Sequence, residues 1–202
     1  YSSAAWGSAV EMVFKEASKL WNVPSIQVVP PFYDHSGYLE AFADVARPVL
    51  EGLQPDAVVM SFHGLPERHC VKSDESDGRH CFQSPDCCET IVSANRNCYR
   101  AQCFATARGL GARLGISDEI MHVCFQSRLG SDPWIRPYTD EVILALARSG
   151  TRRVAVLSPA FVADCLETLE EIGICLFYIS DAADDTFSLV PCHPHTLPTH
   201  LY

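Results

Sequence analysis

His63 is the side chain best suited to proton or metal chemistry in this 202-residue chain. It follows the apolar run 57–62 and precedes a turn that contains Gly64 and Pro66, so we expect it to point out of a sheet at the end of a buried strand. Because the ordinary pKa of histidine is about 6.5, such a residue can accept a proton or bind a divalent metal at neutral pH. The alternative, a strand-end histidine bonded to a backbone carbonyl, is the commoner case for so short a motif taken alone.

Two carboxylates, Glu167 and Glu171, lie four residues apart in a second segment. On a helix this spacing places them on one face, where they can hold a cation weakly and pass it along. The alternative is a solvated helix edge. It suits Glu170 better than Glu167, because Phe161 and Leu166 give Glu167 apolar neighbours in the sequence.

A third segment, 125–134, carries Arg128 and Trp134 after another apolar run. A flat aromatic ligand with carboxylate side groups would bind such a pair through ring stacking and charge-assisted hydrogen bonds. A tryptophan that only covers a loop is nearly as good an interpretation.

Six of the ten cysteines crowd into residues 70–103. In the absence of a recognisable secretion signal, metal binding is favoured over a disulfide framework. Four thiolates suit a [2Fe–2S] cluster or a structural zinc ion. The predicted ligands are Cys81, Cys88, Cys98 and Cys103. A set of reduced structural thiols is the third alternative, although isolated cysteines are usually dispersed.

The spacing of Cys98 and Cys103 adds a geometric condition. Five residues correspond to about 140° around an α-helix, so both can bind one cluster only if Cys98 lies outside the regular helix. Cys87 is a possible replacement for Cys88, and Cys70 is a weaker candidate.

Alternating helix and strand patterns position these segments. Apolar residues at helical spacing predict helices over 4–21, 37–52, a stretch ending at about 114, 139–149 and 162–172. Short apolar runs predict strands at 26–29, 57–62, 121–125, 154–157 and 188–190. This alternation predicts an α/β fold with a doubly wound parallel sheet. In such sheets ligands bind beyond the carboxyl ends of the strands, where loops 62–70, 126–138 and 158–168 lie.

The bulk composition excludes several classes of function. The net charge is −10 and no block of Lys or Arg occurs, so we expect no nucleic-acid binding. No apolar run approaches the roughly 18 residues of a membrane span, which leaves at most peripheral membrane contact. We expect a cytoplasmic protein, and the oligomeric state stays open.

The strings SFHGLPE, FQSRLG-DPW-RPYTDE and P-FVADCLETLEEI resemble the corresponding segments of ferrochelatases, in the same order, over residues 20–172. The resemblance implies a chelatase-like fold of two similar Rossmann-like halves and the insertion of Fe(II) into protoporphyrin IX in heme biosynthesis. It implies that His63 is the proton-accepting histidine of the metal site and that Glu167 is the carboxylate opposite. Phe161 would be a pocket-wall aromatic and Glu171 the next acid on a helix that conducts the metal.

The same resemblance favours the [2Fe–2S] cluster, because one group of bacterial ferrochelatases carries a cluster in an internal segment like this one. One turn beyond Glu171, where the family has another acid, this chain has Cys175. Two other interpretations stay open. One is a chelatase for another tetrapyrrole or another metal, and the other is a non-catalytic iron–sulfur or zinc protein. Protoporphyrin is favoured over coproporphyrin by resemblance alone.

The resemblance also implies that the chain is a fragment. We expect residues 1–55 to be a remnant of the N-terminal α/β half. Residues 56–192 would be the C-terminal half with a Cys-rich insertion at about 70–103, and 193–202 a truncated tail. Much of the porphyrin-binding wall would belong to the missing part, so we expect weak or no activity from the chain alone.

Overall fold

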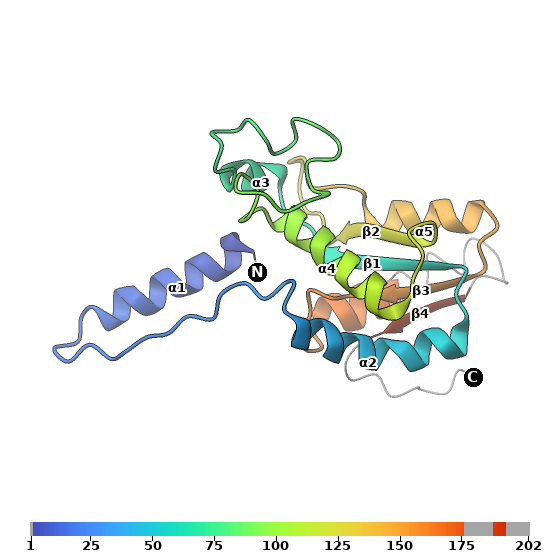
Figure 1. Ribbon diagram of the computed structural model, residues 1–202, viewed down its shortest axis with the longest axis horizontal. Helices are drawn as coiled ribbons and strands as arrows, with labels where there is room; N and C mark the ends of the chain where they lie inside the picture. The colour runs from blue at the N-terminus through green and yellow to red at the C-terminus, as the bar shows by residue number, and fades with distance from the viewer. Residues whose placement is uncertain (1, 176–187, 193–202) are drawn as a thin grey trace.

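The computed structural model describes residues 2–175 and, for the backbone, 188–192 (Figure 1). Four parallel strands form one sheet in the order β2-β1-β3-β4. They are β1 (Ala57–His63), β2 (Met121–Gln126), β3 (Arg153–Leu157) and β4 (Ser188–Cys192). The predicted parallel α/β sheet is therefore confirmed. The expected tail 193–202 lies outside the described residues.

Helices cover both faces of the sheet. The α-helices are α1 (Ser3–Ala17), α2 (Ser36–Leu53), α3 (Glu67–Lys72), α4 (Tyr99–Leu114) and α5 (Thr139–Arg148), and a π-helix, η1, spans Glu167–Cys175. None of the helices within the described ranges is long and apolar enough to cross a membrane.

Alternation along β1 divides the core into two layers. Met60 and Phe62, both fully buried, pack with α2 and α4 on one face of the sheet. Val59 packs with Ile143 of α5 and Ile172 of η1 on the other. Successive side chains of a strand point to opposite faces, so a continuous apolar run is what a strand covered on both sides requires.

The strand predicted at 26–29 is wrong. This segment has no regular structure, and Val29 is 69% exposed. Pro24, Pro30 and Pro31 remove backbone donors around it, and a short apolar run without a neighbouring strand has nothing to pair with.

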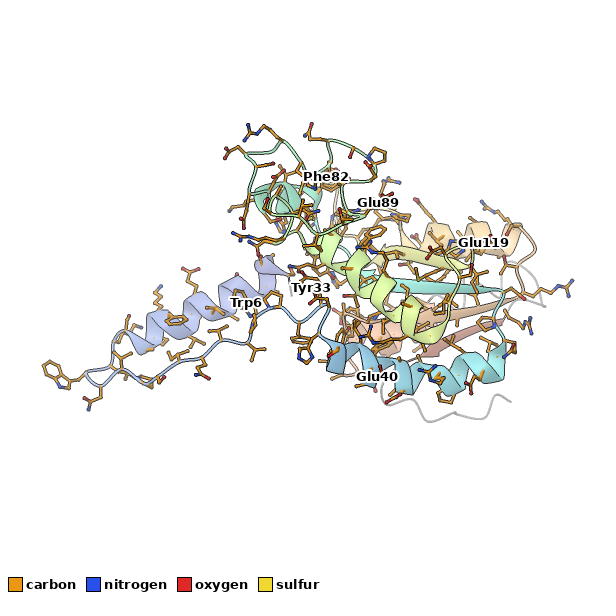
Figure 2. All side chains as sticks on the ribbon, viewed as in Figure 1. Trp6, Tyr33, Glu40, Phe82, Glu89 and Glu119 are labelled. Carbon is orange, nitrogen blue, oxygen red and sulfur yellow. The ribbon has the colours of Figure 1, made fainter. Side chains whose placement is uncertain are left out.

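The first helix ends at Ala17, four residues before the predicted end. Its apolar side chains do not build a core with the described residues: Trp6 and Phe14 are exposed, and Trp21, beyond the helix, is 98% exposed. Figures 1 and 2 show α1 projecting away from the sheet, with Trp6 on it. The helix forms as its amphipathic pattern predicted, but residues 2–175 provide no surface that buries its large apolar side chains.

The helix predicted over 162–172 begins later than expected. Residues 162–165 are irregular, and the π-helix follows a single helical residue, Leu166. Thr168 sets this start, because its Oγ1 accepts a 3.0 Å hydrogen bond from Cys165 N and lies 3.1 Å from Cys165 O. The side chain therefore caps the first turn and leaves the preceding residues free to form the loop that carries Phe161.

Candidate functional site

The carboxyl ends of β1, β2 and β3 bring the three predicted loops together. His63, the last residue of β1, pairs in register with Gln126, the last residue of β2. The His63 ring lies 6.4 Å from the Trp134 ring and 6.5 Å from the Phe161 ring, measured between centroids. The structure thus places three of the predicted residues in one aromatic-walled group.

Local backbone contacts fix the His63 ring. Its Nδ1 lies 2.6 Å from the carbonyl oxygen of Gly64. Since a carbonyl can only accept, Nδ1 carries the proton and Nε2 keeps a free lone pair in the neutral ring. The carbonyl bond considered as the alternative role is therefore present, and it prepares the ring to act as a base or a ligand.

Gly64 is needed for this arrangement. Its N–H donates to Gln126 O at 2.7 Å, which joins the ends of β1 and β2. A Cβ at this position would lie 2.8 Å from that same carbonyl oxygen and 3.1 Å from the Trp134 ring. Only glycine allows the two strand ends and the indole to approach so closely.

Glu167 begins the π-helix and is held in its ionised form. Hydrogen bonds from its own backbone N–H and from Cys165 lower the pKa of its carboxyl, and the nearby His63 lowers it further by charge interaction when the ring is protonated. A carboxylate and an imidazole with a free nitrogen therefore share one electrostatic environment at this end of the sheet.

Glu171 is anchored to the end of β2. Its Oε1 accepts a 2.7 Å hydrogen bond from Ser127 N. Its Oε2 accepts bonds from the Ser127 hydroxyl and, at 3.4 Å, from Nε2 of Gln126. Neither Gln126 nor Ser127 was predicted as a site residue, although both stand at a strand end, which is the position that marks such residues.

Arg128 is already paired within the chain. Its guanidinium binds Asp140 through two hydrogen bonds of 2.7 and 2.9 Å, and this bond raises the pKa of Arg128. The same group lies 4.3 Å from the centroid of the Tyr138 ring. Trp134 donates its indole N–H to Leu129 O at 2.8 Å. The predicted Arg–Trp pair thus lies near the site, but its polar groups are occupied by protein partners.

A pocket of about 300 Å³ adjoins the acidic side of the site. Glu171, Arg128, Asp140 and Cys175 are among the residues that line it, whereas His63 and Glu167 are not. Of the two predicted acids, Glu171 therefore faces this pocket.

The Cys-rich segment buries its thiols. The buried cysteines of this segment are Cys70, Cys81, Cys87, Cys88, Cys98 and Cys103. Figure 2 shows the segment through Phe82 and Glu89, to one side of the amino-terminal end of α4. Cys98 is the N-cap of α4 and so lies outside the regular helix, which meets the condition for Cys98 and Cys103 to bind one cluster.

Two polar side chains shape the backbone of this segment. Asp74 accepts hydrogen bonds from the backbone N–H groups of His80 at 3.0 Å and Cys81 at 2.7 Å. Asn95, fully buried, donates to the carbonyl oxygens of Cys87 at 2.8 Å and Thr90 at 2.9 Å. These bonds satisfy backbone groups that the irregular segment would otherwise leave unpaired.

Cys98 is the centre of the thiol contacts. Hydrogen bonding with Cys70 raises the pKa of Cys98, and hydrogen bonding with Cys98 raises that of Cys88. Burial, followed by the charge of Cys98, raises the pKa of Cys81. The Cys87 and Cys88 sulfurs lie 3.7 Å apart. A raised pKa caused by a neighbouring thiol marks sulfurs that lie close together, where a bound cation would stabilise the thiolate form.

Cys103 faces a different neighbour. Its charge, after burial, raises the pKa of the Tyr38 hydroxyl, which donates a hydrogen bond to Pro159 O. Within residues 2–175, no three His, Cys, Asp or Glu side chains are arranged to hold a single metal ion. The donors present are therefore pairs of thiols rather than a closed single-ion cage.

Comparison with known proteins identifies a family for nearly the whole chain. The ferrochelatase family model matches residues 1–197. A ferrochelatase of Opitutus terrae is 42% identical over 194 residues, which are 95% of this chain and 55% of the relative. One of Pseudomonas fluorescens is 44% identical over 191 residues, 92% of this chain and 55% of the relative. One of Pseudomonas entomophila is 51% identical over 148 residues, 73% and 43% of the two chains. The chain spans about half the length of these curated relatives.

Proposed function

Because the chain belongs to the ferrochelatase family, we propose that the protein of which it is a part inserts ferrous iron into protoporphyrin IX in heme biosynthesis. The observation that carries the proposal is the group formed by His63 between Trp134 and Phe161, in the electrostatic range of an ionised Glu167. Aromatic walls suit a flat macrocycle, and the two polar side chains suit the exchange of protons for a metal ion.

The reaction replaces two pyrrole N–H protons with one Fe²⁺, so charge balances when two protons leave. In the proposed mechanism Nε2 of His63 accepts one pyrrole proton, releases it to water and then accepts the second, because the Gly64 carbonyl holds the other ring nitrogen protonated. Glu167 binds the incoming Fe²⁺ through its carboxylate, which its lowered pKa keeps charged at neutral pH. Glu171, which lines the adjoining pocket, precedes Glu167 on the path of the metal.

Anaerobic incubation of the full-length protein with Fe(II) and protoporphyrin IX tests this proposal. We expect heme to form, and His63→Ala to lower its rate by about 10²–10⁴-fold, the usual contribution of a general base. Leu129→Ala, at a side chain that is 79% exposed, is the matched control and should retain the wild-type rate. Porphyrin binding without turnover would instead favour a non-catalytic protein, and preference for another metal would favour a different chelatase.

We further propose that the Cys-rich segment holds a [2Fe–2S] cluster. Each iron of such a cluster takes two of the four cysteine sulfurs, so pairs of neighbouring thiols fit it better than they fit a tetrahedral zinc ion. The contacts of Cys98 favour Cys70, Cys81, Cys88 and Cys98 as ligands, with Cys70 in place of the originally predicted Cys103. Such a cluster would supply one-electron chemistry and a structural staple for the segment.

The 202 residues span about half the length of the curated relatives, which affects the activity expected of them alone. We propose that residues 1–55 are the remainder of an N-terminal α/β half and that 56–192 form most of the C-terminal half. On this proposal the described sheet provides the His63 side of the site but lacks part of the wall opposite, so the 202 residues alone turn over slowly or not at all. We place the protein in the cytoplasm, with no nucleic-acid partner and at most peripheral membrane contact.

A further inference from the structure

A chain of buried polar side chains lies directly beneath the site, in a layer that is otherwise apolar. Its members are Ser61 of β1, Thr139 at the start of α5, and Gln126 of β2, which are 0%, 2% and 4% exposed. The Ser61 hydroxyl donates to Oε1 of Gln126 at 2.7 Å and lies 2.8 Å from Oγ1 of Thr139. Burial of a polar side chain costs free energy unless its hydrogen-bonding groups are paired. Three apolar residues at these positions would avoid that desolvation cost, which indicates a role of the three polar side chains beyond packing.

The hydrogen-bond chemistry gives Gln126 a single orientation. Oε1 lies 2.7 Å from the Ser61 hydroxyl, which can donate to it, and the NH₂ faces two groups on the other side that can only accept. There Nε2 donates to the backbone carbonyl of Glu167 at 3.1 Å and to the Glu171 carboxylate at 3.4 Å. A reversed amide would set an oxygen against both of these acceptors, the Glu167 carbonyl and the Glu171 carboxylate.

We propose that Gln126, oriented by Ser61 and Thr139, is the positioning residue that sets where the π-helix presents Glu167 to His63. The proposal deepens the chelatase site and rests on the function proposed above. Both Nε2 contacts fall on η1, one at its first residue and one a turn later, so Gln126 connects the sheet to the helix that carries the metal-binding carboxylate. In this role Gln126, which also lines the pocket bordered by Glu171, acts through its hydrogen bonds to η1.

Three substitutions and one control substitution in the full-length protein test this positioning role of Gln126. Thr139→Val removes the hydroxyl and keeps the shape, whereas Thr139→Ser keeps the hydroxyl. Gln126→Glu keeps the shape and replaces the NH₂ donor with an oxygen that repels Glu171 and the Glu167 carbonyl. Ser158→Ala is the matched control, because Ser158 is a buried strand-end serine whose Oγ has no hydrogen-bond partner among the described residues.

We expect Thr139→Val and Gln126→Glu to lower kcat by about tenfold or more, with the KM for porphyrin unchanged within about twofold, since the substrate-binding wall is untouched. Thr139→Ser should recover most of the wild-type kcat, and Ser158→Ala should keep it. Amide hydrogen exchange adds a readout that does not depend on turnover: exchange across 167–172 should accelerate in the first two variants and not in the last two.

The outcomes separate the two proposals. If the wild-type protein forms no heme, the proposed function fails, and the exchange data alone judge the role of Gln126. If Thr139→Val and Gln126→Glu fold, keep wild-type kcat and leave exchange across 167–172 unchanged, the positioning role is overturned. Equal loss of kcat in Thr139→Val and Thr139→Ser would also overturn it, because the hydroxyl would then not be the group that matters.

Discussion

Replacement of Arg100 by Gln should lower the reduction potential of the proposed iron–sulfur cluster. Nη1 of Arg100 lies 3.1 Å from the Cys88 sulfur, and its guanidinium carbon lies 4.9 Å from the centroid of the Phe104 ring. Nε and Nη2 are both 3.4 Å from the carbonyl oxygen of Arg136. These contacts fix the positive charge of Arg100 next to the sulfur of Cys88, a proposed cluster ligand. Reduction adds a negative charge, so a fixed cation favours the reduced form.

The size of the effect follows from the contact. A hydrogen bond to a charged group contributes about 1.5–3 kcal/mol, and only the part that differs between the two oxidation states changes the potential. Because Arg100 is half-buried, solvent screens it, and the lower end of that range is the appropriate estimate. About 1.4 kcal/mol is a tenfold change in the equilibrium, or about 59 mV for one electron, so we expect a fall of roughly 60 mV.

An anaerobic redox titration of the full-length protein, followed by visible absorbance, measures this shift. Arg108→Gln is the matched control, because Arg108 donates to the backbone carbonyl of Cys88 at 3.3 Å rather than to its sulfur. We expect it to move the potential by less than half as much. An intact cluster in Arg100→Gln with an unchanged or higher potential would refute the reasoning. A colourless wild-type protein with stoichiometric zinc would refute the cluster itself.

Three further predictions concern the thiols, the core and an ion pair. Cys70→Ser should reduce the iron content of purified protein at least as much as Cys98→Ser, whereas Cys103→Ser should retain it; retained iron in Cys70→Ser would return Cys103 to the ligand set. Ile143→Ala, at a fully buried side chain of α5, should lower the free energy of unfolding in urea by about 2–5 kcal/mol, and a loss below about 1 kcal/mol would contradict the packing. Hydrogen bonds from Arg153 lower the pKa of Asp56 to about 2. The contribution of the ionised Asp56 to the free energy of unfolding is therefore complete above the ordinary pKa near 3.9 and is lost as the pH falls toward 2. Urea midpoints measured across this window should fall less in Asp56→Asn than in the wild type.

The strands of the sheet could be predicted from the sequence because burial on both faces makes them continuous apolar runs. The prediction at 57–62 differs from β1 by only one residue, and the prediction at 121–125 is equally close to β2. The same signal failed at 26–29, because an apolar run forms a strand only beside another strand, and its partner is a property of the tertiary fold. Residue patterns therefore located the sheet but could not exclude an extra strand.

The site shows the same division between local and long-range information. His63 could be found because its position at a strand end, before glycine, is a local feature. The pairing of Arg128 with Asp140 could not, because it depends on how the start of α5 returns to the end of β2. Gln126 was missed for a similar reason: a glutamine at a strand end is unremarkable in sequence, and its orientation follows only from its contacts with Glu167 and Glu171 of η1.

The two residues at the centre of the site depend on different parts of the fold. His63 is fixed by the carbonyl of its neighbour, and the charge state of Glu167 is set mainly by its own N–H and by Cys165. The tautomer of His63 and the charge of Glu167 are thus set by local contacts, whereas the link between their two elements passes through Gln126 and the core below it. Loss of His63 should therefore remove the base, whereas the uncharged substitution Thr139→Val beneath the site should lower kcat and leave the shape of its pH profile unchanged, which a pH profile of kcat would reveal.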